Sequence, residues 1–383
     1  MNLITYVQNM RELGQAKEVG LKEVIICPKE LSRFGELSVQ ETNQLAIEAK
    51  ALGMSPVLEW DILMTENEMR PALEAFKQVN LDAFDSVRVQ DPGAVEWVLE
   101  HTDKKIQLIV ETGNHNLESL IAWKKCLGER LERLVLSIEL PLEKCKAYKE
   151  ALGAPVEFLI LGRILLFYTP RNLLSSLLPE DDQLRARPQL SAVGESEESP
   201  HKGFPALENR HGTFMFHIKH QFLMEHLAEL DFLDRARVDF RFDSSFELLA
   251  KANEVARGTL SPKAFKELYP FDVIKGFYKV NKTDVLFKKL KNRRLQRKDD
   301  NYIGEALEVK KGGHLVIRIK GRRGIEKGDR LLFITPEGKE LRAPVVELKD
   351  VELRDIENAP PESLAIMNYL GGVWVKSQVY KDS

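Results

Sequence analysis

The side chains best suited to bind an anion lie close together in a short segment that follows residue 156. Arg163, Tyr168, Arg171 and Ser175 occur there within 13 residues. A guanidinium group binds a carboxylate or a phosphate through two parallel hydrogen bonds, and the phenol and hydroxyl groups add further donors. Arg171 could equally form a structural ion pair beneath a loop, and the sequence leaves both interpretations open.

Polar residues also lie next to other predicted strands. Asn114 and His115 follow one strand, and Lys219 and Arg241 lie close to two later ones. Loops that follow the strands of a parallel barrel build its binding site. Together with the four residues above, these residues are therefore predicted ligands for a small anion at a barrel mouth.

A run of basic residues indicates a second kind of partner. Residues 282–330 hold 16 Lys and Arg against 7 Asp and Glu. Such a patch can bind the phosphates of RNA without reading its sequence, and the nearby rings of Tyr278, Phe287 and Tyr302 could stack on bases. A solvated helix face is the alternative. The candidate RNA-binding residues are Lys288, Lys289, Lys291, Arg293, Arg294, Arg297 and Lys298.

The elements that must position these residues alternate along the first 160 or so positions. Short apolar runs and amphipathic segments follow one another about every 25 residues, which predicts βαβ units, and seven such strands, with an eighth further on, favour a closed TIM-like β/α barrel. Strands are predicted at 3–7, 23–27, 55–58, 86–89, 107–111, 133–137, 157–161 and 235–240. Helices are predicted at 10–19, 39–52, 66–78, 93–101, 117–127, 142–151 and 220–229.

The remaining segments differ in composition. Residues 178–211 are rich in Pro, Ser, Glu, Arg and Gly and show no apolar period, so we expect a long loop there. Beyond a basic connector at 282–300, residues 301–383 alternate with period two between glycines. This pattern predicts a small C-terminal antiparallel β-barrel. The predicted barrel domain accordingly spans 1–281.

Bulk properties narrow the class of protein. No run of about 18 apolar residues exists, so no membrane span is expected, and the N-terminus shows no secretory pattern. The three cysteines, Cys27, Cys126 and Cys145, match neither a disulfide framework nor a metal knuckle. Sparse cysteines fit a reducing compartment, and we expect a cytoplasmic protein.

The segment 157–175 resembles the signature of the collagenase-like peptidase family U-32. Its Gly162, Tyr168, Arg171 and Ser175 stand in register with that signature. Weaker resemblances follow in the expected order along most of the chain, among them Val89-Gln-Asp91 and Asn301-Tyr-Ile-Gly-Glu305. The resemblance implies the same two domains that the periodicity predicts.

The chain departs from the family at two positions. Leu165 and Asn172 stand where the family has cysteines, which are understood to hold an iron–sulfur cluster in relatives that modify RNA or assist ubiquinone hydroxylation. Neither side chain can replace a thiolate ligand. The resemblance therefore implies a divergent member with no iron–sulfur cluster, and neither another cofactor nor a metal is predicted.

Three functions remain open from the sequence. The first is RNA binding, or an accessory role in RNA modification beside a cluster-bearing paralogue. The second is an enzyme that acts on a small anionic substrate at the barrel mouth. A peptidase ranks last, because the sequence contains neither a Gly-x-Ser-x-Gly elbow nor a His-Glu-x-x-His motif.

Overall fold

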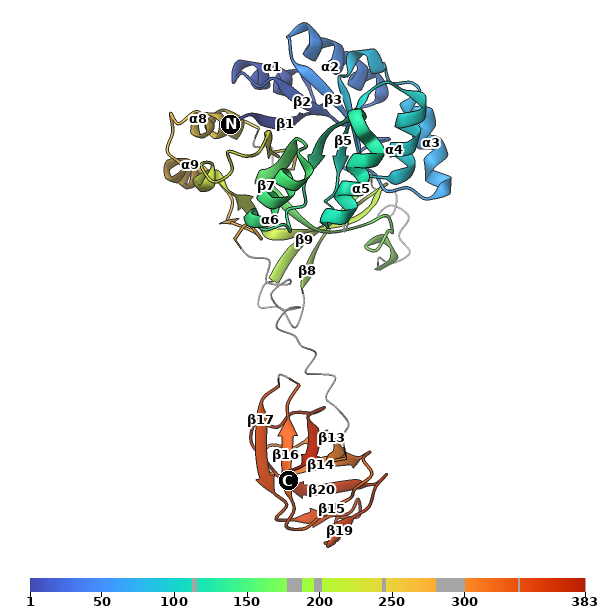
Figure 1. The fold of residues 1–383 in the computed structure, drawn as a ribbon, viewed down its shortest axis with the longest axis vertical. Helices are drawn as coiled ribbons and strands as arrows, with labels where there is room; N and C mark the ends of the chain where they lie inside the picture. The colour runs from blue at the N-terminus through green and yellow to red at the C-terminus, as the bar shows by residue number, and fades with distance from the viewer. Residues whose placement is uncertain are drawn as a thin grey trace. The chain divides into compact units, whose positions relative to one another are not determined.

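The chain folds into two compact units, Met1–Lys282 and Thr283–Ser383, which are described separately. The computed structural model (Figure 1) describes residues 1–111, 116–177, 188–195, 202–242, 246–279, 300–336 and 338–382. The basic connector predicted at 282–300 falls almost entirely outside these residues. Among the described helices, none is both long enough and apolar enough to cross a membrane.

The first unit is a closed barrel of parallel strands, as the sequence predicts. Each strand pairs with its neighbour in chain order, and β11 closes the ring by pairing with both β1 and β7. The barrel strands are β1 (Leu3–Val7), β2 (Glu23–Ile26), β3 (Ser55–Trp60), β4 (Ser86–Val89), β5 (Lys105–Ile109), β6 (Leu131–Val135), β7 (Val156–Thr169) and β11 (Arg235–Val238).

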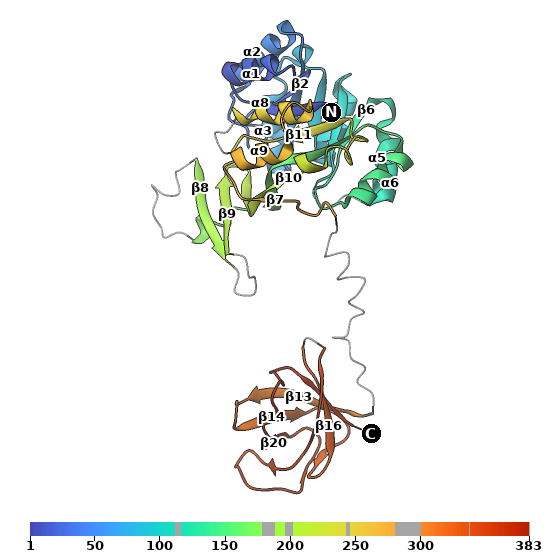
Figure 2. The same ribbon diagram turned by 90° about the vertical axis from the view of Figure 1, so that its left-hand side faces the viewer.

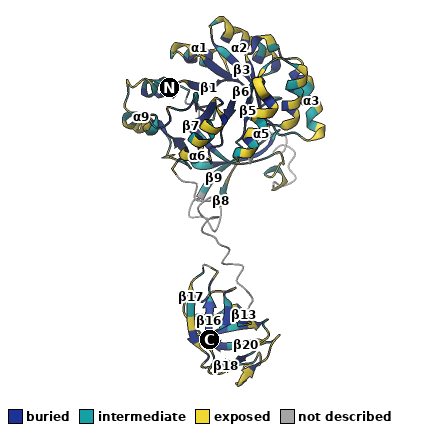
Figure 3. Cartoon of the chain, viewed as in Figure 1, coloured by how far each residue is buried: buried dark blue, intermediate teal, exposed yellow. Residues whose placement is uncertain are grey.

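Helices cover the outside of this barrel, and the apolar core lies between them and the strands (Figure 3). Local sequence fixes their ends. Ser38 and Glu41 form a capping box at the start of α2, and the Asp91 side chain accepts from the backbone at the start of α4. The helices are α1 (Met10–Glu18), α2 (Val39–Ala51), α3 (Glu66–Phe76), α4 (Pro92–His101), α5 (Leu117–Leu127), α6 (Leu142–Leu152), α8 (Leu248–Ala256) and α9 (Pro262–Leu268).

Strand β7 continues beyond the barrel and carries an antiparallel extension. Its second half pairs with β10 (Gly212–Phe222), which pairs in turn with β9 (Lys202–Asn209), and β9 pairs with β8 (Gln189–Glu195). Figure 2 shows these strands beside the barrel. The short β12 (Val273–Ile274) also pairs with β10.

This extension corrects two predictions. The helix predicted at 220–229 is wrong: β10 runs to Phe222 because its backbone pairs with β7 and β12, and only a short 3-10 turn, Met224–His226, follows. The loop predicted at 178–211 contains the β8–β9 hairpin within its described part. The sequence does not indicate this hairpin, because the residues of β8 are mostly exposed and show no apolar alternation.

Gly162 allows β7 to leave the barrel. Its φ of +137° lies in a region that favours glycine, and a Cβ atom there would lie 2.7 Å from the backbone oxygen of Asp239. The Asp239 amide donates to the Leu161 carbonyl at 2.9 Å, so β7 and the end of β11 approach closely at this point. A glycine is therefore required where the strand changes partner.

The second unit is a curled antiparallel sheet with its own apolar core, as predicted. Its strand order is β17-β16-β21-β13-β14-β20-β18, and the two-stranded β15–β19 ladder lies apart from this sheet. The strands are β13 (Tyr302–Val309), β14 (His314–Ile319), β15 (Ile325–Glu326), β16 (Arg330–Ile334), β17 (Glu340–Pro344), β18 (Leu348–Lys349), β19 (Asn358–Ala359), β20 (Leu364–Asn368) and β21 (Gln378–Lys381).

Candidate functional site at the barrel mouth

A cavity of about 340 Å³ opens at the carboxyl ends of the barrel strands. This volume falls at the small end of the range for ligand sites. Charged and aromatic side chains dominate its lining: Tyr6, Arg33, Phe34, Glu111, Glu139, Arg163, Tyr168, Phe216, Arg237, Asp239, Arg241 and Phe242. It is the face on which β/α barrels carry their active sites.

One wall of the cavity is a set of paired charges. The Nε of buried Arg33 donates to Asp61 at 2.6 Å, and its Nη2 lies 3.7 Å from Glu111. Glu111 also pairs closely with Arg237, whose Nη1 donates to the Tyr6 hydroxyl at 3.2 Å. These contacts fix the side chains in place before any ligand arrives, which is the property of a preorganised site.

Arg241 is clamped beside this wall. Its Nη2 and Nε donate to the two Asp239 oxygens at 2.8 and 3.1 Å, and its Nη1 donates to Glu59 at 3.4 Å. Its guanidinium carbon also lies 3.2 Å from the centre of the Tyr6 ring. A cation held over an aromatic face and between two carboxylates has little freedom to move.

The two carboxyl groups beside Arg241 differ in acidity. Burial raises the pKa of Glu59, and the charge of Asp61 raises it further. Burial acts in the same direction on Asp239, but the adjacent Arg241 outweighs it and lowers the pKa. Burial and the charge of Glu59 also raise the pKa of the Cys27 thiol, which donates to Glu59 at 3.1 Å.

Another part of the cavity lining is aromatic. The Phe34 ring lies 4.7 Å from that of Phe242 and 5.8 Å from that of Phe216, measured between centroids. The guanidinium of Arg163 lies over two of these rings, 5.7 Å from Phe216 and 5.5 Å from Phe242. Arg163 therefore reaches the cavity from an apolar surface, where water competes less for its hydrogen bonds.

Tyr168 lies at the rim. Its hydroxyl accepts from the Leu63 amide at 3.2 Å and donates to the His211 carbonyl at 3.3 Å. Its ring stacks on Phe214 at 4.8 Å, and the Arg33 guanidinium lies 5.4 Å from its centre. Tyr168 thus ties the loops after β3 and β9 to the pocket wall.

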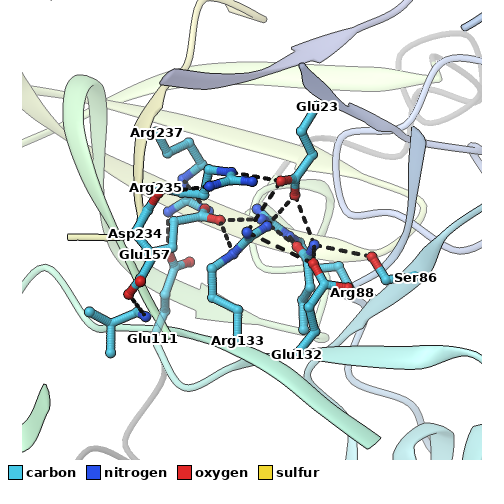
Figure 4. A network of polar contacts seen from close by, with 12 residues as sticks. Glu23, Ser86, Arg88, Glu111, Glu132, Arg133, Glu157, Asp234, Arg235 and Arg237 are labelled. Carbon is cyan, nitrogen blue, oxygen red and sulfur yellow. Dashed lines mark hydrogen bonds and ion pairs between the residues drawn. The ribbon is translucent and has the colours of Figure 1, made fainter. Parts of the chain in front are cut away.

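An ionic network fills the barrel beneath the cavity (Figure 4). Fully buried Glu157 lies 2.5 Å from Arg88, 3.2 Å from Arg133 and 3.6 Å from Arg237. Arg133 then pairs with Glu23, and Glu23 pairs with Arg235 at 2.8 Å. The network extends from the cavity to the opposite end of the barrel.

The predicted site residues divide into two groups. Arg163, Tyr168 and Arg241 line the cavity together. Arg171 and Ser175 follow β7 and are not among the lining residues, and the Ser175 amide donates to Glu208 at 3.0 Å. Lys219 lies on β10, 3.7 Å from Asp272. Asn114, His115 and the predicted RNA-binding residues 288–298 fall outside the described residues.

The sequence analysis missed several residues of the pocket. Arg33 and Phe34 lie in the loop after β2, Glu111 follows β5 and Arg237 lies on β11. Arg33 and Phe34 follow a predicted strand, Glu111 ends one, and all three could have been considered on that ground. Arg237 alternates with Arg235 and Asp239 along its strand, a pattern that places all three on one face.

The donors at the cavity do not fit an iron–sulfur cluster. Leu165 lines the cavity with an apolar side chain, Asn172 is exposed, and Cys27 is engaged by Glu59. Within the described residues, no group of three or more His, Cys, Asp or Glu side chains could hold a metal ion. The absence of a cluster stays a prediction for the chain as a whole.

Fold and site together define a β/α-barrel protein with a polar-aromatic pocket at its carboxyl mouth. The chain belongs to Peptidase family U32. The sequence pattern of this family matches residues 8–245, which are more than half of the chain. Among curated proteins, none matches the chain.

Solved structures resemble the chain only in part. The C-terminal domain of a Geobacillus thermoleovorans protein assigned to the U32 peptidases is 14% identical, and the match covers 23% of this chain and 99% of that domain with a TM-score of 0.21. The U32 peptidase Mk0906 is 16% identical over 43% of this chain and 70% of its own, with a TM-score of 0.36. Orotidine 5′-phosphate decarboxylase of Thermotoga maritima is also 16% identical, over 42% and 79%, with a TM-score of 0.30.

Proposed function

We propose that the barrel mouth binds a small organic anion with an apolar body, and that this site carries the function of the chain. One observation carries the proposal: the cavity of about 340 Å³ holds the Arg163 guanidinium over the rings of Phe216 and Phe242. A carboxylate or phosphate of the ligand would bind the guanidinium, and its apolar part would pack on the rings.

The other three arginines of the cavity have a structural role. Arg33, Arg237 and Arg241 are all buried and ion-paired with carboxylates of the barrel. Removing one partner of such a pair leaves a buried charge without compensation, so these arginines shape the cavity. Arg163 lines the same cavity and lies over the rings of Phe216 and Phe242, so we assign to it the contact with the anion.

A thermal-shift screen with small carboxylates and phosphates tests the proposal. A ligand at about 100 times its Kd stabilises the folded state by about 2.7 kcal/mol, which a rise in Tm reports. We expect at least one of these anions to stabilise the protein, and the Arg163→Met variant to lose the effect. The Lys219→Met variant, changed outside the cavity, is the matched control and should respond like the unmodified protein.

Two results would contradict the proposal. In the first, none of the anions shifts Tm. In the second, Arg163→Met responds as strongly as Lys219→Met, which would place the anion elsewhere on the chain.

Peptidase activity has less support at this site. The pKa of the Cys27 thiol is raised by burial and by Glu59, so the thiol stays protonated, and a protonated thiol is a poor nucleophile. Burial also raises the pKa of Cys145, to about 12. We therefore keep peptidase activity as the last alternative.

RNA binding through residues 288–298, and an accessory role beside a cluster-bearing paralogue, stay predictions. Tyr278 and Tyr302, expected to stack on bases, are both buried, which does not support that part of the hypothesis. Several basic side chains of the second unit are also neutralised, among them Lys320 by Glu305 and Lys327 by Glu357.

A further inference from the structure

Three loops of the second unit meet at one end of its sheet. The β16–β17 turn, the loop before β21 and the β13–β14 turn are neighbours, because Ile334 at the end of β16 pairs with Gln378 at the start of β21. Gln378 also pairs with Glu305 of β13, which continues from there toward its turn with β14. Side chains from three distant parts of the sequence therefore share this end.

A tryptophan is exposed at this end. Trp374 is 63% exposed, in contrast to Trp60 in the first unit, which is fully buried. Exposed Leu307 lies close by, because the preceding residue, Ala306, accepts a hydrogen bond from the Lys376 amide at 2.7 Å. An exposed indole presents a flat face that is available for stacking.

The loop holds the backbone of Trp374 in a defined position. The Trp374 amide donates to the Ser377 hydroxyl at 3.1 Å, and the Ser377 amide donates back to the Trp374 carbonyl at 3.0 Å. Lys376 adopts a positive φ of 70°, which is rare for a residue with a side chain.

Four exposed lysines lie in the same three loops as the tryptophan. Lys310 and Lys311 lie in the β13–β14 turn, Lys339 lies in the β16–β17 turn, and Lys376 lies two residues after Trp374. None of the four forms an ion pair with a described residue, whereas most other basic residues of this unit do.

Two carboxylates at the same end contact a histidine and an arginine. Glu308 lies 3.5 Å from His314, and Glu340 lies 3.2 Å from Arg342. Among the described residues of these loops, the four lysines outnumber these two carboxylates.

We propose that this end of the second unit binds a single-stranded polynucleotide. The Trp374 surface, defined as Leu307, Lys310, Lys311, Lys339, Trp374 and Lys376, would stack one base on the indole and contact the flanking phosphates with the lysines. An aromatic platform beside positive charge is the arrangement by which proteins bind single strands without reading sequence. A duplex hides its base faces and would not use the indole.

The test uses the full chain and fluorescein-labelled single strands of mixed sequence, about twelve nucleotides long to span one such site. Anisotropy gives the affinity for RNA, for DNA of the same sequence and for the RNA duplex. We expect Trp374→Ala to weaken single-strand binding roughly 5- to 150-fold, the range of one base stack. Trp374→Phe should lose less, because a smaller ring remains. Stronger binding of RNA or of DNA identifies the natural strand type.

Matched controls distinguish binding by the indole from nonspecific binding and from binding by the connector. Val351→Ala removes a side chain of equal exposure from another loop of the same unit and should leave binding unchanged. Replacing the four lysines by alanine should flatten the salt dependence, by a slope of roughly 0.7 for each phosphate that a lysine no longer neutralises. The double replacement Lys327→Ala and Lys349→Ala removes two lysines that are paired with carboxylates, and it should leave the salt dependence unchanged.

Equal affinities of Trp374→Ala and the unmodified chain would overturn the proposal, even if the connector binds RNA. So would equal binding of duplex and single strand. Because none of these variants touches the barrel mouth, the outcome is independent of the anion site proposed above.

Discussion

Replacing Glu23 by glutamine tests whether the charges inside the barrel stabilise the fold. Glu23 pairs with Arg133 and Arg235 and is almost fully buried. Burial alone would raise its pKa, but the two guanidinium groups outweigh burial and hold the pKa at about 2, against a usual value of 4.5. The carboxylate is therefore more stable in the folded chain than in the unfolded one.

The sign and size of the effect follow from this pKa. Above pH 4.5 the carboxyl is charged in both states, and its full contribution is present. As the pH falls, the unfolded chain takes up a proton first, so the contribution is lost between pH 4.5 and 2. At about 1.4 kcal/mol for each pKa unit, it amounts to roughly 3 kcal/mol, of which roughly 2 kcal/mol is gone by pH 3.

Urea unfolding at pH 7 and pH 3 measures this contribution. In a Trp374→Phe background, the remaining tryptophans, Trp60, Trp97 and Trp123, all report on the barrel unit. At pH 7, Glu23→Gln should be less stable by about 3 kcal/mol, because buried Arg133 and partly buried Arg235 lose a counter-charge. Between pH 7 and pH 3, it should lose about 2 kcal/mol less than its parent.

Glu48→Gln is the control, because this side chain is exposed on α2. It should lose as much stability as the parent between the two pH values. If Glu23→Gln shows the same pH dependence as Glu48→Gln, the reasoning about the barrel interior is refuted.

Two further predictions concern backbone geometry and thiol chemistry. Gly162→Ala should destabilise the barrel by about 3 kcal/mol, because the new side chain is strained at this positive φ and overlaps the end of β11. Gly53 also has a positive φ but lies in open space, so Gly53→Ala should cost only about 1 kcal/mol. Thermal melts that show equal costs for the two variants would contradict this reasoning. Iodoacetamide should alkylate exposed Cys126 in the folded protein but leave Cys27 and Cys145 unmodified until urea is added, as peptide mass spectrometry would show; early modification of Cys27 would be the contrary result.

Much of the barrel was predictable, because its signals are local. Alternating apolar runs placed the eight barrel strands, and caps such as Ser38 with Glu41 placed helix starts. The sequence failed where pairing overrides local pattern. The segment from His220 was expected to be a helix, yet its first residues pair with β7 and β12.

The site was only partly predictable, for a related reason. Arg163, Tyr168 and Arg241 could be selected as strand-end residues, and the structure places them in one cavity. Their partners could not be selected, because interactions such as that of Arg33 with Asp61 depend on how distant loops meet. Trp374 was missed because an exposed tryptophan and a core tryptophan look alike in sequence.

The ionic network inside the barrel also has a consequence for how the chain reaches its folded state. Arg133 lies 110 residues from Glu23, and Arg235 lies 212 residues from it. A partly assembled barrel that lacks β11 would hold charges in its interior without their partners, which is highly unfavourable. Intermediates with an open ring are therefore disfavoured, and the docking of β11 between β1 and β7 should make barrel formation a concerted, all-or-none step.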